Sequence, residues 1–286
     1  MHSHSSKHDF VSKDKKSMVF FYETYIGRII LKILVRPFFT NLSENVLNSK
    51  FSCLMIDSFV RKNHIDMSQF ECRKFTSFND FFTRRIKDGM RKIDLKEESA
   101  ISPSDAKLSA YKIDKNSCFY IKNSWYSLSD LLKSNTLAEK YIGGDLLVYR
   151  LEATDYHRYC YIDNGYQKRN YYIKGEFHSV QPIALRNYPV FKHNSRSFTI
   201  LHTENFGDVI QMEVGALFVG KINNFYEKAS FKKGTEKGMF EFGGSTIIVI
   251  YPKDRVTVFD RIFKNTEKGI ETVVKMGECI GVKKYR

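Results

Sequence analysis

From about residue 95 onward, the chain is built of short runs of β-branched and aromatic residues, and this pattern constrains the fold more than any other. The runs, separated by turn residues, are LLVYRLE, YHRYCYIDNG, RNYYIKGEFHSV, SFTILHT, DVIQMEVGALFVGKI, STIIVIY and RVTVF. Many short strands with turn signals between them are typical of a mainly antiparallel β domain. The helical exception is SLSDLLKSNTLAEKYIGG, with Ser127 or Ser129 as the N-cap and Gly143-Gly144 as the stop.

The first third of the chain has a helical pattern instead. Residues 1–17 are mostly polar and predict a disordered tail. Residues 18–40 are apolar and aromatic, interrupted at roughly helical spacing by three basic residues, Arg28, Lys32 and Arg36. LNSKFSCLMIDSFVRKNHID continues this pattern. We therefore predict an α+β fold, with a helical region over residues 18–94 and a compact, mainly antiparallel β domain over residues 95–286.

The strongly basic composition bears on the partners of the protein. Its 46 Lys and Arg residues outnumber its 32 Asp and Glu residues, for a formal net charge of +14. Anionic partners are therefore favoured: nucleic acid, an acidic membrane surface or a phosphate-bearing substrate. The helix over residues 18–40 either packs on the core or lies in a membrane interface. The basic residues of FNDFFTRRIKDGMRKID, among them Arg84 and Arg91, likewise fit either an anionic-surface contact or a solvated face.

The cysteines favour a reducing compartment, and the apolar runs are too short for a spanning helix. The five cysteines are odd in number and widely spaced, and none form a CxxC pair, which argues against a disulfide framework and against a structural zinc site. We predict no metal centre. No uninterrupted apolar run reaches the ~18 residues of a spanning helix. The polar first seventeen residues predict no signal peptide.

Three polar clusters carry residue types that are used in catalysis. Asp105 follows a Ser-Pro turn in ISPSDAKLSAY, His157 lies between aromatic residues in TDYHRYCYIDNG, and His178 precedes a proline-containing strand in EFHSVQPIALRN. Taken singly, each has a structural explanation, as a turn residue, a half-buried histidine or a surface strand residue. Together with a serine they are the parts of an activated nucleophile, in which a base removes the hydroxyl proton and a carboxylate orients the base.

A fourth feature is the stretch FGGSTIIVIY, where two glycines and Ser245 come just before a β-branched run. Paired glycines weaken a strand unless the backbone needs room or unusual dihedral angles. At these residues the chain resembles the phosphatidylserine decarboxylase proenzymes. The resemblance covers most of the chain, in the segments FYETYIGRIILKILVRPFF, FTSFNDFFTRRIK, SPSDAKLSAY, DYHRYCYIDNG, HSVQPIALRN, FGDVIQMEVGALFVGKI and FGGSTIIVIY.

The resemblance implies that the protein cuts its own backbone before the serine of the Gly-Ser-Thr motif. On this chain the hydroxyl of Ser245 attacks the carbonyl of Gly244, and the resulting ester eliminates to dehydroalanine, which loses ammonia and leaves a pyruvoyl group at the new N-terminus. Gly244 has no side chain to obstruct the attack, and Gly243 tolerates strained backbone. Residues 1–244 and 245–286 then stay together as a heterodimer.

The reaction implied by the resemblance converts phosphatidylserine to phosphatidylethanolamine and carbon dioxide. A pyruvoyl ketone condenses with the serine amine of the lipid and accepts the electron pair that carbon dioxide leaves behind. His157 is the candidate proton donor to the resulting carbanion. The resemblance makes residues 95–286 the catalytic domain. Because the substrate stays in the bilayer, residues 18–94 are then the membrane-associating region, and we expect a peripheral protein on an anionic membrane, at the cytoplasmic face, with no nucleic acid partner.

The chain departs from the family pattern at two positions. The better-known members read Y-H-R-x-H, and their second histidine pairs with the aspartate of the SPxD motif and with the serine as the base for self-cleavage; here Cys160 takes its place. Either His157 serves both steps, or His178 supplies the base, or Cys160 is tolerated because a slow single turnover needs little help, or the chain is a poorly processed relative. Asp105 keeps an orienting role in the first two cases. Ala106 replaces the usual glycine of the SPxDG pattern.

Other classes of function explain less of the sequence. A pyruvoyl-dependent decarboxylase acting on a soluble amino acid derivative has no use for an amphipathic N-terminal region. A basic lipid-binding or nucleic-acid-binding module explains the charge of +14 but leaves the GGST stretch unexplained. A conventional serine hydrolase is disfavoured, since the chain has no G-x-S-x-G motif.

Overall fold

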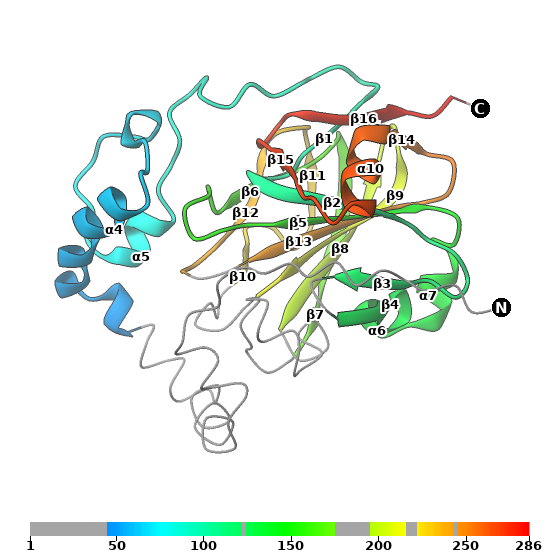
Figure 1. Ribbon diagram of the computed structural model, residues 1–286, viewed down its shortest axis with the longest axis horizontal. Coiled ribbons are helices and arrows are strands. Elements are labelled where there is room, and N and C mark those ends of the chain that lie inside the picture. Colours follow the sequence, from blue (N-terminus) through cyan, green and yellow to red (C-terminus); the bar gives the residue numbers. More distant parts are fainter. Residues whose placement is uncertain (1–44, 122–123, 175–194, 216–221, 243–244, 286) are drawn as a thin grey trace.

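The computed structural model describes residues 45–121, 124–174, 195–215, 222–242 and 245–285 (Figure 1). Helical elements come first, and an extended segment joins them to a β body. The elements of the helical region are η1 (Lys50–Met55), α4 (Ile56–Lys62), η2 (Met67–Gln69) and α5 (Phe78–Phe82). The predicted tail and the predicted helix over residues 18–40 lie outside the described residues.

A small aromatic core holds the helical region together. The sequence FNDFF places Phe78, Phe81 and Phe82 on α5 at positions that a helix turns to one side, and all three are buried with Ile56 of α4. Ser77 caps the helix, because its hydroxyl accepts a hydrogen bond from the N–H of Asp80 at 3.1 Å. The short helix α5 is therefore fixed at its start by a cap and along its length by packing.

Arg84 lies in the interior rather than on a basic surface. Its side chain is 1% exposed, and its guanidinium carbon lies 4.2 Å from the ring centre of Phe70 and 4.7 Å from that of Phe81. Both alternatives that the sequence suggested for this residue, a contact with an anionic surface and a solvated face, are therefore wrong for Arg84. Cation–π contacts with two rings take their place.

The β body holds one large sheet and three smaller ones. All strand pairings among the described residues are antiparallel. The large sheet has eight strands in the order β11-β7-β8-β9-β13-β5-β2-β15, and the smaller sheets have the orders β10-β12-β6, β1-β16-β14 and β3-β4. The strands are β1 (Ser99–Ile101), β2 (Ala106–Lys112), β3 (Cys118–Ile121), β4 (Ser124–Ser127), β5 (Asp145–Arg150), β6 (Arg158–Cys160), β7 (Gly165–Ile173), β8 (Arg196–Thr203), β9 (Gly207–Val214), β10 (Ile222–Asn224), β11 (Ala229–Phe231), β12 (Glu236–Phe240), β13 (Thr246–Tyr251), β14 (Val256–Val258), β15 (Thr272–Val274) and β16 (Cys279–Lys283).

Strand β13 is an interior strand of the large sheet, and all six of its residues are buried. Successive side chains of a strand point to opposite faces. Ile247 and Val249 accordingly join a core with residues of β6, β12 and β16, whereas Ile248 and Ile250 join a second core with residues of two short helices, α6 (Leu128–Leu132) and α7 (Asn135–Glu139). The β-branched run of the sequence thus serves both cores at once.

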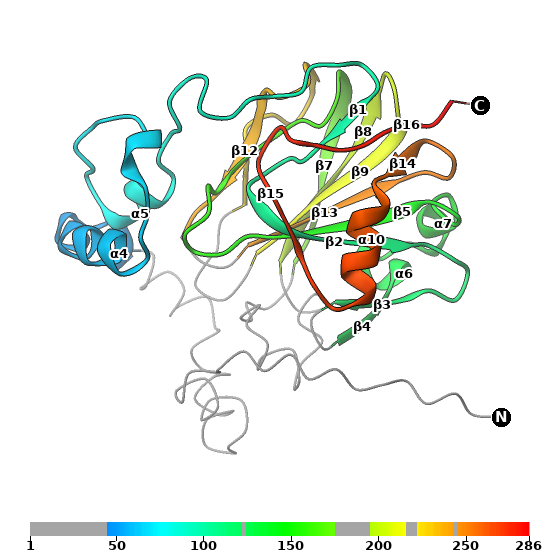
Figure 2. The same ribbon diagram turned by 45° about the horizontal axis from the view of Figure 1, so that its top comes forward.

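The helices of the β body confirm one expectation and add one element. Ser127 rather than Ser129 caps α6, in a capping box with Asp130, and Gly143 takes a left-handed φ of 84° after α7. A third helix, α10 (Asp260–Glu267), was not predicted; it packs on β2 (Figure 2) and buries Ile262 in the first core. Its eight residues hold few apolar positions, so their helical spacing is weak as a sequence signal.

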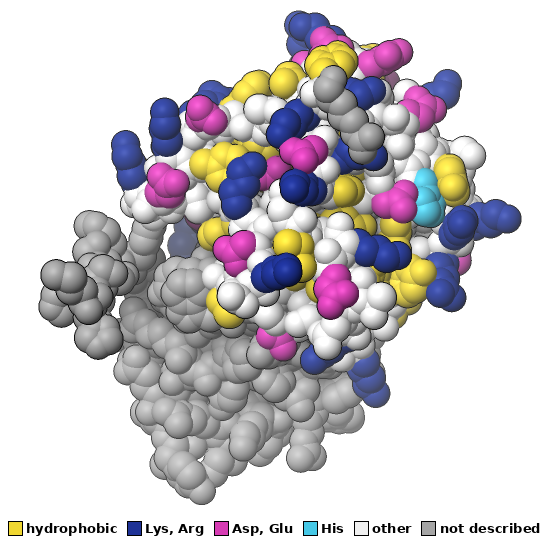
Figure 3. Space-filling model, turned by 90° about the vertical axis from the view of Figure 1, so that its right-hand side faces the viewer, with side chains coloured by type: hydrophobic (Ala, Val, Ile, Leu, Met, Phe, Trp, Pro, Cys, Tyr) yellow, Lys and Arg dark blue, Asp and Glu magenta, His cyan; other side chains and the backbone are white. Residues whose placement is uncertain are grey.

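The fold class predicted from the sequence is confirmed: helices in the N-terminal region and a mainly antiparallel β body. The net positive charge is not gathered on the side of the β body shown in Figure 3, where the described Lys and Arg side chains alternate with Asp and Glu. None of the helices within the described residues is long and apolar enough to cross a membrane.

Candidate active site

Asp105 and Ser245 lie at the same end of the large sheet, where the strands β2 and β13 begin. Asp105 directly precedes β2, Ser245 directly precedes β13, and both strands are antiparallel to β5, which lies between them. Arg150 of β5 pairs with Lys107 on one side and with Thr246 on the other, so the two strands begin level with each other. Because neighbouring strands are ~4.8 Å apart, the two backbones are separated by roughly 10 Å, which leaves room for a side chain between them.

Ser245 is fully buried at the entrance to β13. Its carbonyl accepts a hydrogen bond from the N–H of Leu151 at 2.9 Å, which continues the pairing of β13 with β5 by one residue. Its hydroxyl oxygen has no hydrogen-bond partner among the described residues. A buried hydroxyl without a partner costs free energy. Ser104, Tyr149 and Tyr251 also have such hydroxyls, so the hydroxyl of Ser245 points to a function only together with the two glycines that precede it.

His157 lies just before β6, on the side of the helical region. Its ring is buried and packs against Phe82 of α5 with a distance of 4.0 Å between ring centres. Its Nδ1 lies 2.9 Å from the carbonyl oxygen of Asp155. A carbonyl can only accept a hydrogen bond, so Nδ1 carries the proton and the lone pair of the neutral ring is on Nε2.

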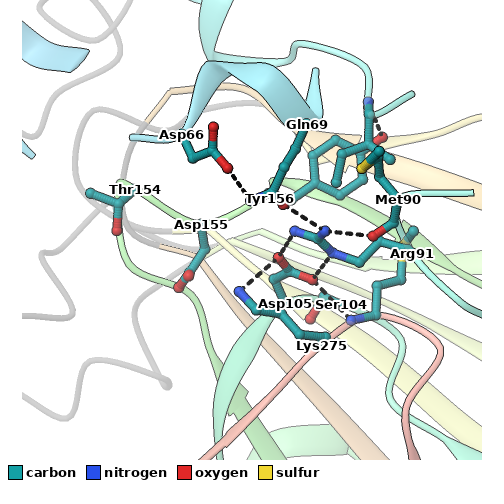
Figure 4. Close-up of polar contacts among 12 residues, drawn as sticks. Asp66, Gln69, Met90, Arg91, Ser104, Asp105, Thr154, Asp155, Tyr156 and Lys275 are labelled. Carbon is teal, nitrogen blue, oxygen red and sulfur yellow. Dashed lines mark hydrogen bonds and ion pairs between the residues drawn. The ribbon is translucent and has the colours of Figure 1, made fainter. Parts of the chain in front are cut away.

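The buried carboxylate of Asp105 is held by the positive groups of Arg91 and Lys275 (Figure 4). Arg91 donates from Nε to one carboxylate oxygen at 2.8 Å and from its terminal nitrogen to the other at 2.5 Å. The ammonium of Lys275 lies 3.2 Å from the carboxylate, and the N–H of Met276 donates to it at 2.9 Å. Burial alone raises the pKa of Asp105, but the hydrogen bonds from Arg91 and Met276 and the charges of Arg91 and Lys275 lower it below its usual range. Asp105 is therefore a carboxylate at neutral pH.

Replacement of Asp105 by asparagine is expected to lower the free energy of unfolding by about 3 kcal/mol at neutral pH, because it leaves the buried Arg91 without its counter-charge. Since folding lowers the pKa of Asp105, its contribution is present above the unfolded-state value near ~4 and is lost as the pH falls through the folded-state value. Urea unfolding at several pH values should show the deficit of the variant shrinking below about pH 4. Arg261→Gln, in the exposed pair with Glu278, is the control and should change stability by less than ~1 kcal/mol; an equal effect of both substitutions would contradict this prediction.

Cys160 lies against the turn that carries Asp105. Its N–H donates to the carbonyl of Pro103 at 2.9 Å, and its sulfur lies 3.9 Å from the carbonyl oxygen of Ser102. The position that holds a histidine in the better-known relatives therefore does meet the Ser-Pro-Ser-Asp turn. Burial raises the pKa of the Cys160 thiol to about 12. At neutral pH the thiol stays protonated and is not a base.

The predicted site residues are only partly brought into contact. Among the described residues, the partners of the Asp105 carboxylate are Arg91, Lys275 and Met276, and not His157. His178 and Gly244 lie outside the described residues.

The sequence reasoning missed two residues of this site. The first is Asp155, whose backbone carbonyl orients His157. Burial and the charge of Asp105 raise the pKa of the Asp155 carboxyl group, whereas a hydrogen bond from the N–H of Glu152 lowers it. Arg91 was considered only as a surface residue, yet its side chain is 10% exposed in the pair with Asp105. The TDYHR motif could have pointed to Asp155, which lies two positions before His157; nothing local to the sequence points from Arg91 to Asp105.

This arrangement is suited to acyl transfer from the backbone. A buried hydroxyl without a described partner lies directly after two glycines, and a histidine lies beside the segment that leads into them, since the N–H of Phe240 donates to the carbonyl of His157 at 2.9 Å. A hydroxyl, a histidine and a carbonyl of the backbone are the groups that a self-acylation reaction requires.

Known proteins of one family are similar to this chain over most of its length. The family described as phosphatidylserine decarboxylase matches residues 78–282. A phosphatidylserine decarboxylase proenzyme 2 from Clostridium acetobutylicum is 44% identical over 263 residues, which cover 92% of this chain and 90% of that protein. A phosphatidylserine decarboxylase proenzyme from Ruminiclostridium cellulolyticum is 43% identical over 266 residues, covering 91% of this chain and 89% of that protein.

Proposed function

Because this chain belongs to the phosphatidylserine decarboxylase family, we propose that it cuts its own backbone between Gly244 and Ser245. Its family makes it a self-processing enzyme that converts phosphatidylserine to phosphatidylethanolamine and carbon dioxide. The observation that carries the proposed cleavage point is the buried hydroxyl of Ser245, which directly follows two glycines and has no hydrogen-bond partner among the described residues. The intact masses of the purified protein test it: we expect fragments of residues 1–244 and 245–286, the shorter one lighter by one ammonia than a simple hydrolysis product.

The cleavage begins with an acyl shift. The oxygen of Ser245 forms a bond to the carbonyl carbon of Gly244, the peptide C–N bond breaks, and the chain is then joined by an ester. Removal of the α-proton of Ser245 expels the carboxylate of Gly244, and water replaces the nitrogen of the resulting dehydroalanine as ammonia leaves. The residues around Ser245 fit the resulting pyruvoyl group, because Ser245 is fully buried and its hydroxyl gives up no described hydrogen bond when it is lost. A pyruvoyl group supplies a ketone that condenses with an amine and accepts the electron pair left by carbon dioxide.

His157 is our candidate for proton transfer in both steps. The carbonyl of Asp155 holds its Nδ1–H, which directs the basic Nε2 atom. Asp105 acts indirectly, as a positioning residue. Its charge contributes to raising the pKa of Asp155, and its hydrogen bonds hold the turn against which Cys160 lies. His178 remains the second candidate for the base of the cleavage step, because the protonated thiol of Cys160 does not serve as one.

The two fragments are proposed to remain one folded unit. The short fragment would begin with Ser245 and continue into β13, which pairs along its length with β5 and over five residues with β9, both from the long fragment. All six residues of β13 are buried, so separation would expose a full strand of apolar side chains to water.

The helical region is proposed to bring the enzyme to an anionic membrane, at the cytoplasmic face. In η1, the side chains of Phe51 and Leu54 are 84% and 83% exposed. The same region carries exposed basic residues, Lys50 in η1 and Arg61 and Lys62 in the last turn of α4. Apolar side chains that enter the acyl boundary and basic ones that face the headgroups are typical of interfacial helices.

Replacing Phe51 and Leu54 together by serine should weaken binding to vesicles of phosphatidylcholine and phosphatidylserine by roughly tenfold or more, because burial of each side chain is worth about 1.5–3 kcal/mol. Sedimentation with the vesicles measures the effect, and self-cleavage should proceed at the unchanged rate. The matched control replaces Ile270 and Val273 of the β body, which are 51% and 65% exposed, by serine. Equal losses in the two double variants would show that η1 is not the membrane contact.

A further inference from the structure

The helix α5 is in direct contact with the segment that leads to the proposed cleavage point. The ring of Phe242 packs edge-on against Phe78 and against Phe82, with a distance of 5.0 Å between ring centres in both cases. Phe82 also packs against the ring of His157. The candidate base and the segment before the two glycines are therefore positioned by one short helix.

Asn79 of α5 adds a hydrogen bond to the backbone of this segment. Its side-chain oxygen accepts from the N–H of Phe242 at 3.1 Å. Its amide nitrogen donates to the side chain of Glu241 at 3.3 Å and to the side-chain oxygen of Asn48 at 3.0 Å. Because both acceptors lie on the nitrogen side of the amide, the oxygen is directed at Phe242.

The segment is thus fixed on both sides of the proposed cleavage point. Upstream, the N–H of Phe242 is bound to Asn79, and downstream the carbonyl of Ser245 is bound to the N–H of Leu151 at 2.9 Å. Only Gly243 and Gly244 lie between these two anchors. The path of two residues between fixed ends is short, so the position of the upstream anchor governs where the Gly244 carbonyl can lie relative to the hydroxyl of Ser245.

We propose that Asn79 is a positioning residue for self-cleavage, which holds Phe242 so that the Gly244 carbonyl meets the hydroxyl of Ser245. This inference rests on the proposed cleavage between Gly244 and Ser245. An intramolecular attack gains most of its rate from geometry, and a displacement of about 1 Å is enough to slow it by up to two orders of magnitude. Once the bond is cut, the carbonyl no longer has to be presented, so Asn79 matters for maturation and not for turnover.

The test follows the cleavage of freshly translated proenzyme over time on denaturing gels. Asn79→Ala should slow the appearance of the two fragments by about tenfold or more. In a chain that also carries Glu241→Gln, so that no second carboxylate faces position 79, Asn79→Asp keeps an oxygen that accepts from the N–H of Phe242 and should cleave within about twofold of the Glu241→Gln chain. The matched control is Glu241→Gln, which keeps an acceptor for the amide nitrogen of Asn79, leaves the bond to Phe242 in place, and should cleave at the unaltered rate.

Turnover of the matured protein separates positioning from a merely structural role. After prolonged incubation, the cleaved fraction of Asn79→Ala should decarboxylate phosphatidylserine with an unchanged kcat. The inference is overturned if Asn79→Ala cleaves at the normal rate, if Asn79→Asp combined with Glu241→Gln is as slow as Asn79→Ala, or if kcat falls as far as the cleavage rate. Failure of the proposed function itself would look different, since the unaltered chain would then show no cut between Gly244 and Ser245.

Discussion

The Ser245→Ala variant is expected to remain a single, uncut polypeptide without decarboxylase activity. Alanine has no hydroxyl to attack the carbonyl of Gly244, so neither the ester nor the keto group derived from it can form. Denaturing gels and intact mass should show one species of 286 residues where the unaltered chain gives two fragments. Activity should fall to the background rate, because no ordinary side chain accepts the electron pair released by decarboxylation.

The matched control is Ser104→Ala. Ser104 is also fully buried, and its hydroxyl likewise has no hydrogen-bond partner among the described residues, but no glycine pair precedes it. This variant should cleave normally and keep its activity. Two fragments from Ser245→Ala, cut at the same bond, would remove Ser245 from its proposed role.

Replacing His157 by glutamine should lower the decarboxylation rate by about 10²–10⁴-fold, the range expected when a general acid or base is removed. The glutamine amide can still donate a hydrogen bond but holds no transferable proton near neutral pH. Cleavage of the proenzyme should slow as well, since the same Nε2 atom is proposed to serve both steps. Time courses on gels score cleavage, and carbon dioxide release per cleaved molecule scores turnover.

Two further variants separate the candidates for the cleavage base. Cys160→Ala should cleave at a rate close to that of the unaltered chain, because burial keeps the thiol protonated. His178→Ala should cleave faster than His157→Gln. If the His157 variant instead matures at the normal rate and the His178 variant stays uncut, the base of the cleavage step is His178, and His157 acts only in decarboxylation.

Most of the architecture could be predicted because it depends on neighbours along the chain. A continuous β-branched run marked β13, and the serine cap marked the start of α6. The strands around them followed from turn residues. The helix α10 was not recognised in this way, since its eight residues hold only two large apolar side chains, Ile262 and Phe263, which are too few to mark a helical period.

The site was predictable in its components but not in its contacts. Ser245, His157 and Asp105 were identified from motifs. The structure places Ser245 and Asp105 at the same end of the large sheet, just before the strands β13 and β2. That Asp105 pairs with Arg91 depends on where the segment between α5 and β1 lies relative to the start of β2. The contact of His157 with the carbonyl of Asp155 is local, because it joins residues two positions apart. Charge patterns alone also gave no sign that Lys237 and Glu213 form an ion pair of 2.9 Å with both side chains fully buried.

The sequence by itself determined that the chain forms a mainly antiparallel β body after a helical region, and that a serine follows two glycines at the start of a buried strand. These properties arise from periodicity and from backbone preferences, which act between residues close in the chain. Only the tertiary structure decided which charges are paired, that Cys160 is a protonated thiol, and that Asn79 reaches the segment before the glycines. Those outcomes depend on strand order, register and burial, which join residues far apart in the chain and change the free energy of every charge they enclose.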